Sequence, residues 1–124
     1  MLRLVVVLGL VFGLFGGAVW ASDQRLNGAE IEVLLSGNTA VGEWAGDAYR
    51  QWFSADGTTI YAPYGKRSTL GKWRVTEDGY ESWWSGNEWE AYAVIRRGAG
   101  YFWVDLTGEE FGFEVVAGQQ LNWP

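Results

Sequence analysis

The spacing of apolar and polar residues changes at Thr39. Before that point an apolar stripe recurs at helical spacing, formed by Leu26, Ile31, Leu34 and Leu35. Asn27 followed by Glu30 matches a capping box at the start of a helix, and Gly37 is well placed to end one. The pattern predicts one short helix near 27–36.

From Thr39 onward apolar and polar residues alternate, and glycine-containing turns recur every 8 to 12 residues or so. This rhythm is typical of an all-β domain. It predicts eight strands, over 39–44, 48–54, 58–64, 71–76, 80–85, 88–97, 101–107 and 111–117.

Asp56-Gly57 is the clearest hairpin signal, because glycine supplies the positive φ that a tight turn needs. Short antiparallel strands joined in this way suit an up-and-down meander that closes into a lipocalin-like barrel, or a strongly curved sheet. Closure would remove the exposed sheet edges. We expect the helix to plug one end of the barrel or to lie across the sheet.

Alternation also divides each strand into two faces, and the more aliphatic face is predicted to point inward. The predicted inward sets are Trp73 and Val75; Trp89, Ala91, Ala93 and Ile95; Phe102, Val104 and Leu106; and Phe111, Phe113 and Val115.

The opposite face carries large rings interleaved with charges. It is predicted to hold the candidate binding residues Arg50, Trp52, Trp83, Tyr92, Arg96, Tyr101 and Trp103. Monomers rarely leave a large aromatic patch bare, so such a patch suggests a docking surface for a small molecule, a glycan or a protein. Three alternatives stay open: cross-strand pairs that stabilise the sheet, a face covered by the helix and tail, or reversed faces that line the cavity of a small-molecule carrier.

The first residues have the layout of a secretory signal. Arg3 precedes an uninterrupted apolar and glycine run from Leu4 to Val19, and Val19-Trp20-Ala21 offers a cleavage site. As a helix, the run would rise about 24 Å, short of a bilayer core of about 30 Å. We therefore expect a cleaved leader at 1–21, a single domain at 22–124, and no stable membrane insertion after cleavage. The alternative is a retained anchor.

Composition narrows the function classes. Without the leader, eight basic residues face fifteen acidic ones, a net charge of −7 that disfavours nucleic acid and anionic lipid as partners. The chain has no Cys, so packing alone must hold it, and no His, the usual general base and metal ligand. Nine Trp and six Tyr supply large rings instead.

Several motifs resemble those of a family of small exported proteobacterial proteins of unknown function. Members show a helix, a Y-x-x-[YF]-F-x-x-[DN]-G hairpin, a G-x-W-x-V strand and a D-G turn. The matching residues here are Tyr49, Trp52, Phe53, Asp56, Gly57, Gly71, Trp73, Val75, Asp78 and Gly79. Gly42-Glu43-Trp44 after a helix is also similar to the opening of lipocalin-like (calycin) barrels, which implies a fold and no activity.

Carboxylates are the main candidates for chemistry. Glu88 and Glu90 are two residues apart, about 7 Å on a strand, which overlaps the carboxylate spacing of glycoside hydrolases. Asp105, Glu109 and Glu110 surround one turn without a recognised calcium-loop pattern. Solvated surface acids are the favoured explanation of both groups, and no catalytic residue, metal site or cofactor is predicted.

Together these observations predict a periplasmic or secreted, non-enzymatic binding protein. Its ligand is expected to be an apolar or aromatic small molecule, a glycan or an envelope protein. The alternatives are an inhibitor of an envelope enzyme, a hydrolase that uses acids such as Glu88, Glu90 or Asp105, and a structural envelope component.

Overall fold

The computed structural model describes residues 23–123, so the predicted leader at 1–21 lies outside the described residues. One helix, α2 (Gly28–Leu35), follows a short strand, β2 (Asp23–Arg25). The remaining strands are β3 (Asn38–Trp44), β4 (Asp47–Phe53), β5 (Thr58–Pro63), β6 (Thr69–Val75), β7 (Tyr80–Trp83), β8 (Glu90–Arg97), β9 (Gly100–Val104) and β10 (Glu110–Ala117). Within this part of the chain, no helix is long and apolar enough to cross a bilayer.

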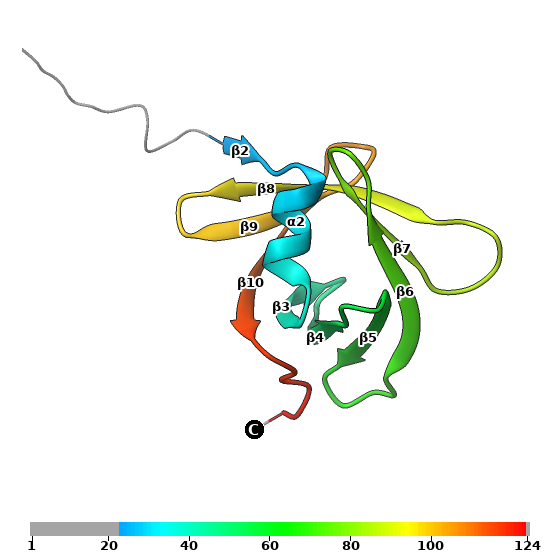
Figure 1. The fold of residues 1–124 in the computed structure, drawn as a ribbon. Helices are drawn as coiled ribbons and strands as arrows, with labels where there is room; N and C mark the ends of the chain where they lie inside the picture. Colours follow the sequence, from blue (N-terminus) through cyan, green and yellow to red (C-terminus); the bar gives the residue numbers. More distant parts are fainter. Residues whose placement is uncertain (1–22, 124) are drawn as a thin grey trace, which may run out of the picture.

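Strands β3 to β10 form a closed antiparallel barrel (Figure 1). Each strand pairs with the next along the chain, and the pairing of β10 with β3 completes the ring. Strand β2 is an addition outside the ring, paired with the end of β8. The predicted lipocalin-like, eight-stranded up-and-down barrel is therefore confirmed.

The turn at Asp56-Gly57 forms as predicted. The Asp56 carboxylate accepts a hydrogen bond from the Thr58 amide at 2.9 Å, and Gly57 has a φ of 95°. The Ser54 amide then donates to the Thr58 carbonyl at 2.8 Å, which closes the β4–β5 hairpin. The aromatics on either side of this turn are strand residues, and the polar tip only reverses the chain.

Helix α2 begins with the predicted capping box. The Asn27 side chain accepts from the Glu30 amide at 2.8 Å, and the Glu30 carboxylate accepts from the Asn27 amide at 2.8 Å. Gly37 follows the helix with a φ of 78°, and its amide donates to the Phe53 carbonyl at 2.7 Å. The helix is thus joined directly to the end of β4.

One end of the barrel is closed by α2 (Figure 1). Leu26, Ile31 and Leu35 are almost wholly buried and belong to the central hydrophobic core. Two backbone hydrogen bonds hold the start of this segment, from the Leu26 amide to Val94 and from the Gly28 amide to Glu77, both 2.9 Å. The helix therefore plugs the barrel, one of the two arrangements that the sequence predicts.

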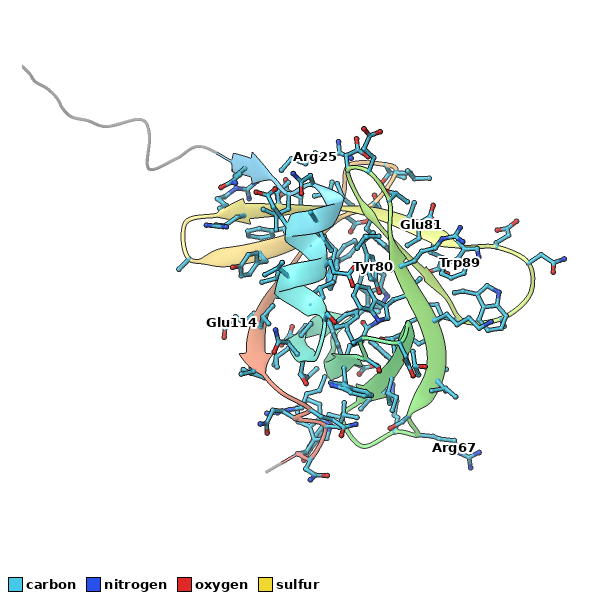
Figure 2. The ribbon with its side chains drawn as sticks, in the orientation of Figure 1. Arg25, Arg67, Tyr80, Glu81, Trp89 and Glu114 are labelled. Carbon is cyan, nitrogen blue, oxygen red and sulfur yellow. The ribbon has the colours of Figure 1, made fainter. Side chains whose placement is uncertain are left out.

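Aromatic rings fill the barrel behind the helix. Trp103 stacks on Phe113 with ring centroids 4.0 Å apart, and Tyr80 lies 4.8 Å from Trp103. Phe53 meets Trp73 edge-on at 5.4 Å. Figure 2 shows Tyr80 inside the barrel, whereas Arg67 and Glu114 lie on its outside. Such ring pairs contribute beyond the area that they bury, which suits a core without a disulfide.

The predicted faces are correct on β6 and β10, where Trp73 and Phe113 are buried, but they are wrong on β9 and on most of β8, where Ile95 is buried as predicted. Val94 is fully buried and Trp103 is 4% exposed, while Leu106 is 88% exposed. The Phe102 ring is only partly exposed, because the Arg97 guanidinium lies over it at 4.7 Å. The pattern gives two alternating sets, and here the aromatic set fills the interior better than the aliphatic one.

The predicted strand over 88–97 also starts later, at Glu90, so Glu88 lies in the β7–β8 loop. Glu88 and Glu90 consequently do not form the predicted pair on one strand face.

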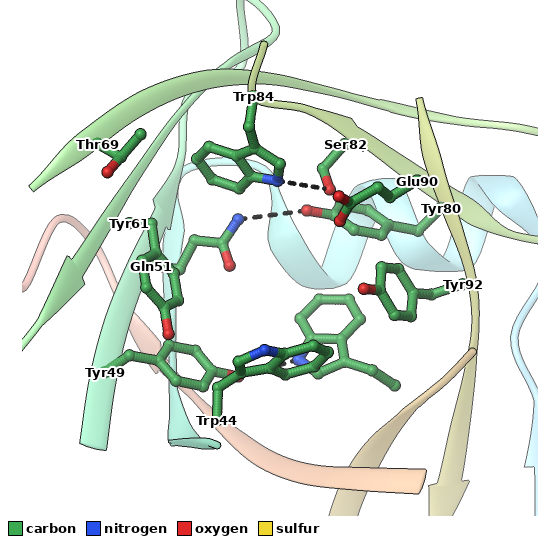
Figure 3. Close-up of a pocket in the computed structure, with 11 residues that line it drawn as sticks. Trp44, Tyr49, Gln51, Tyr61, Thr69, Tyr80, Ser82, Trp84, Glu90 and Tyr92 are labelled. Atoms are coloured by element: carbon green, nitrogen blue, oxygen red, sulfur yellow. Dashed lines mark hydrogen bonds between the residues drawn. The ribbon is translucent and has the colours of Figure 1, made fainter. Parts of the chain in front are cut away.

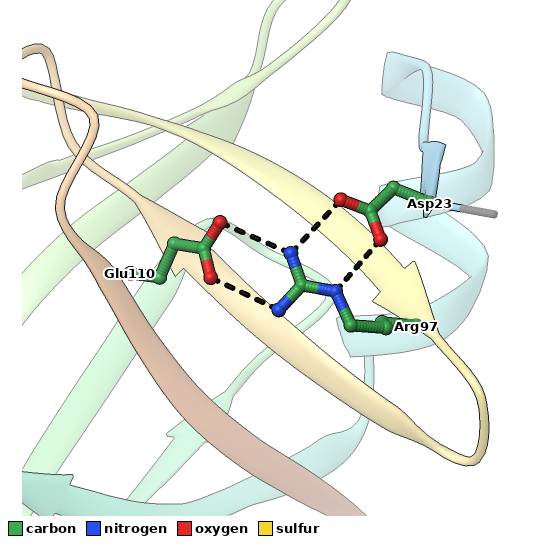
Figure 4. Close-up of polar contacts among 3 residues, drawn as sticks. All are labelled: Asp23, Arg97 and Glu110. Atoms are coloured by element: carbon green, nitrogen blue, oxygen red, sulfur yellow. Dashed lines mark hydrogen bonds and ion pairs between the residues drawn. The ribbon is translucent and has the colours of Figure 1, made fainter. Parts of the chain in front are cut away.

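Arg97 fastens β2 to the outside of the barrel (Figure 4). Its guanidinium donates two hydrogen bonds to Asp23, at 2.7 and 2.8 Å, and two to Glu110, at 3.0 and 3.1 Å. These bonds hold the pKa of both carboxyls below their ordinary values. A bidentate pair on each side fixes the guanidinium geometrically.

Gly28 tests the docking of α2. A Cβ at this position would lie 2.0 Å from the Thr76 carbonyl oxygen, a backbone atom that cannot move aside cheaply. We expect Gly28→Ala to lower the free energy of unfolding by about 1–3 kcal/mol, measured by urea denaturation.

Gly100→Ala is the matched control, because the nearest atom to its added Cβ is the Arg97 oxygen at 3.9 Å. This variant should change stability by less than about 0.5 kcal/mol. Equal stability of the two variants would contradict the close packing of α2 on the β6–β7 turn.

Candidate functional site

A cavity of about 340 Å³ occupies the half of the barrel opposite α2 (Figure 3). Its mouth lies among strand ends: Trp44 ends β3, Thr69 begins β6, Trp84 follows β7 and Glu90 begins β8. The complete lining consists of Trp44, Tyr49, Gln51, Tyr61, Thr69, Tyr80, Ser82, Trp84, Glu90, Tyr92 and Trp103. The barrel is thus packed solid at the helix and hollow at the other end.

Seven of these side chains are aromatic, and neighbouring rings hold them in place. Tyr49 stacks on Tyr61 at 5.1 Å, and Trp84 meets Tyr61 edge-on at 6.0 Å. On the other side of the cavity, Trp44 meets Tyr92 edge-on at 6.0 Å. Because each ring is braced by another, the wall is largely preformed.

Two glycines make room for the wall. Gly42 pairs with Tyr49 across β3 and β4, and a Cβ on Gly42 would lie 3.1 Å from the Tyr49 hydroxyl. A Cβ on Gly71 would lie only 2.5 Å from Cε3 of Trp84. Both glycines belong to G-x-W motifs in the sequence, so these motifs reflect the close approach of a ring to the neighbouring strand.

The polar side chains of the cavity bond mainly to one another. Gln51 is 6% exposed, and its amide nitrogen donates to Thr59 at 3.0 Å and to the Tyr80 hydroxyl at 3.2 Å. The Thr59 hydroxyl in turn donates to the Trp52 carbonyl at 2.8 Å. This chain satisfies the buried amide and fixes the floor of the cavity.

Two indole groups are also satisfied within the wall. The Trp103 Nε1–H donates to the Tyr49 hydroxyl at 3.0 Å, and the Trp84 Nε1–H donates to Ser82 Oγ at 3.1 Å. Figure 3 shows Trp84 beside Ser82 at the edge of the ring of side chains. An indole is a donor and no base, so it does not activate Ser82 as a nucleophile.

The cavity tyrosines are neutral at physiological pH. Burial raises the pKa of Tyr49 to about 12, and it also raises the pKa of Tyr80. Burial, helped by the charges of Glu90 and Asp105, raises the pKa of Tyr92 to about 12. The interior therefore offers neutral hydroxyls and ring faces to a ligand.

The structure separates the seven residues predicted to form one surface. Tyr92 and Trp103 line the cavity. Tyr101 and Arg96 lie together beside α2, with the guanidinium 6.0 Å from the ring. The remaining three, Arg50, Trp52 and Trp83, are on the outside of the barrel. The alternative with reversed faces describes the placement of Tyr92 and Trp103.

Sequence reasoning missed most of the cavity wall, namely Trp44, Tyr49, Gln51, Tyr61, Tyr80 and Trp84. A usable signal was present on β4, where Tyr49 and Gln51 share a face with the buried Phe53. Following that one strand from its packed end to its open end leads from the core into the cavity.

The structure also separates the candidate acids. Glu90 lies at the cavity mouth, and Glu88 is exposed in its loop. The Asp105 carboxylate accepts from the Thr107 amide at 2.9 Å and from the Glu109 amide at 3.0 Å, so it caps a turn. Between residues 23 and 123, no group of His, Cys, Asp or Glu is arranged to hold a metal ion.

No protein-family model matches the chain, and comparisons with curated proteins and with solved structures found no match. The resemblance to small exported proteins therefore stays a prediction, and the function must follow from the chemistry of the cavity itself.

The bond between Trp103 and Tyr49 should support the wall. Tyr49→Phe removes the acceptor and leaves the buried indole N–H without a partner. We expect the free energy of unfolding to fall by about 1–3 kcal/mol in a denaturant titration.

Tyr61→Phe is the control, because its ring stacks on Tyr49 but its hydroxyl makes no hydrogen bond within the described part of the chain. A loss below about 0.5 kcal/mol is expected. A Tyr49→Phe variant as stable as Tyr61→Phe would show that the indole bond contributes nothing.

Proposed function

We propose that this protein is a non-enzymatic binding protein that holds a small, largely apolar or aromatic molecule in the open half of its barrel. The observation that carries the proposal is the cavity of about 340 Å³ with seven aromatic rings in its lining. Ligand pockets in proteins range from about 300 to 1,000 Å³ and combine apolar walls with a few polar groups.

The order of the wall favours binding. Rings that are already braced against one another lose little conformational freedom when a ligand enters, so more of the contact energy appears as affinity. Stacking between Tyr49 and Tyr61 and the indole bond of Trp103 supply this bracing. The Gln51 network adds a fixed floor without an activated nucleophile.

A small molecule suits the geometry better than an envelope protein does. The predicted aromatic docking surface is divided between the cavity, the side of α2 and the outer wall, so it offers no single flat patch. A protein partner would need such a patch to bury a hydrophobic centre. The cavity instead encloses its occupant on several sides.

The proposed location is the periplasm or the exterior of the cell. The leader-like segment at 1–21 supports this location. In that setting a barrel without cysteine needs no oxidation to fold.

Binding can be measured with N-phenyl-1-naphthylamine, a neutral aromatic probe whose fluorescence rises in apolar surroundings. Thr69→Trp places an indole at the cavity mouth, on an exposed residue where substitution should not disturb the core. We expect the purified protein to bind the probe, and Thr69→Trp to weaken binding at least about tenfold.

Leu70→Trp is the matched control, because it adds the same ring to the same strand on the outer face, where Leu70 is 66% exposed. Its affinity should equal that of the unmodified protein. Absence of probe binding, or equal weakening by both variants, would overturn the proposal.

A further inference from the structure

The charge of the cavity has one sign. Among its lining residues in the described chain, Glu90 is the single charged side chain. Glu90 pairs with Ser82 across β7 and β8, and Figure 3 shows its carboxylate turned from β8 into the ring of side chains. A ligand that enters this space meets a carboxylate and no ammonium or guanidinium group.

Further carboxylates surround the mouth. The negative charge of Asp105 reaches Tyr92, and that of Asp47 reaches Tyr61. Asp47 forms an ion pair with Lys66 at 2.6 Å. The negative charge near Tyr92 comes from Glu90 and Asp105. The net charge of −6 on the chain also favours cations over anions as partners.

The aromatic faces in the cavity also lack a cation, unlike those on the outside of the barrel. Outside, three indoles each lie beneath a basic side chain: Trp83 under Lys72 at 5.1 Å, Trp89 under Arg74 at 3.8 Å, and Trp123 under Arg50 at 5.0 Å. Among residues 23–123, no such contact involves a ring of the cavity. The partly exposed rings of the cavity, Trp44, Trp84 and Tyr92, therefore carry no basic side chain over their faces.

We propose that the ligand is an organic cation, with an ammonium group held between Glu90 and the rings near the mouth and an apolar or aromatic body deeper in the cavity. This inference rests on the proposed binding function. Rings combined with a carboxylate are suited to alkylated ammonium groups, because these present a diffuse positive charge on an apolar surface. Among the rings of the cavity, Tyr92 is close enough to Glu90 for that carboxylate to raise its pKa, and Tyr92 meets Trp44 edge-on at 6.0 Å.

The same contacts disfavour a glycan. A sugar needs many hydrogen-bond partners, and several N–H donors of the wall are already engaged: the Gln51 amide nitrogen with Thr59 and Tyr80, the Trp84 indole with Ser82, and the Trp103 indole with Tyr49. Leaving sugar hydroxyls unpaired against an aromatic wall costs free energy. An ammonium group without N–H donors has no such requirement.

Phenyltrimethylammonium and tert-butylbenzene test the proposal, since they have nearly the same shape and differ in charge. Each is titrated into the protein, with displacement of N-phenyl-1-naphthylamine as the readout. We expect the cation to bind about tenfold more tightly, although the neutral compound is the more hydrophobic of the two. Added NaCl should weaken the binding of the cation and leave the binding of the neutral compound unchanged.

Glu90→Gln identifies the carboxylate responsible. In this variant the ratio of the two dissociation constants should shrink about threefold, whereas in Glu88→Gln, an exposed acid two residues away, it should not change. Cellobiose and benzenesulfonate serve as the sugar and anion arms, and neither should displace the probe.

The outcomes distinguish the two proposals. In one outcome, Thr69→Trp blocks probe binding, but tert-butylbenzene competes as well as the cation or better. That result would support the binding function and overturn the proposal that the ligand is a cation. Displacement by cellobiose in place of the cation would do the same. An unchanged ratio in Glu90→Gln would remove the role of Glu90. If N-phenyl-1-naphthylamine itself does not bind, both proposals fall.

Discussion

The insertion of α2 into one end of the barrel is the interaction on which the rest of the structure depends. An eight-stranded barrel has an interior just wide enough for side chains to fill it, or for one small ligand. Leu26, Ile31 and Leu35 fill the helix end together with Phe53 and Val94. Because α2 ends there and no other element between residues 23 and 123 enters from the opposite side, the space beyond Trp103 stays open.

The plug and the cavity are coupled through a continuous series of rings. Trp103 stacks on Phe113 within the core, and its indole N–H bonds to Tyr49 in the cavity wall. The Tyr80 ring likewise meets the Phe53 ring edge-on, with the ring centroids 5.9 Å apart, and the Tyr80 hydroxyl accepts a hydrogen bond from Gln51. The order of the cavity is therefore inherited from the packed core, and a loose fit of the helix would be transmitted to the wall. A chain without cysteine has no covalent constraint to replace this packing.

The sequence predicts where the helix and the strands lie better than it predicts which side of each strand points into the barrel. Strand and helix positions follow from local chemistry, such as the capping box of Asn27 and the turn at Gly57, and the structure confirms both. Which alternating set points inward depends on neighbours that are distant along the chain. On β9, Arg97 from β8 shields Phe102, and Tyr49 from β4 supplies the partner of the Trp103 indole. Neither contact is visible in the local pattern, so aliphatic character was a poor guide there.

The cavity was harder to predict, because it depends on the difference between available and occupied volume. Glycine on one strand and a large ring on the next create that difference locally: Gly42 beside Tyr49, and Gly71 beside Trp84. A methyl group at Gly71 would lie 2.5 Å from the Trp84 ring, and one at Gly42 would lie 2.8 Å from the Gly112 carbonyl oxygen and 3.1 Å from the Tyr49 hydroxyl, so neither site has room for it without a shift. The G-x-W motifs, which resemble packing signatures in the sequence, thus also leave space that a neighbouring ring occupies. These two glycines therefore shape a cavity wall to which they contribute no side chain.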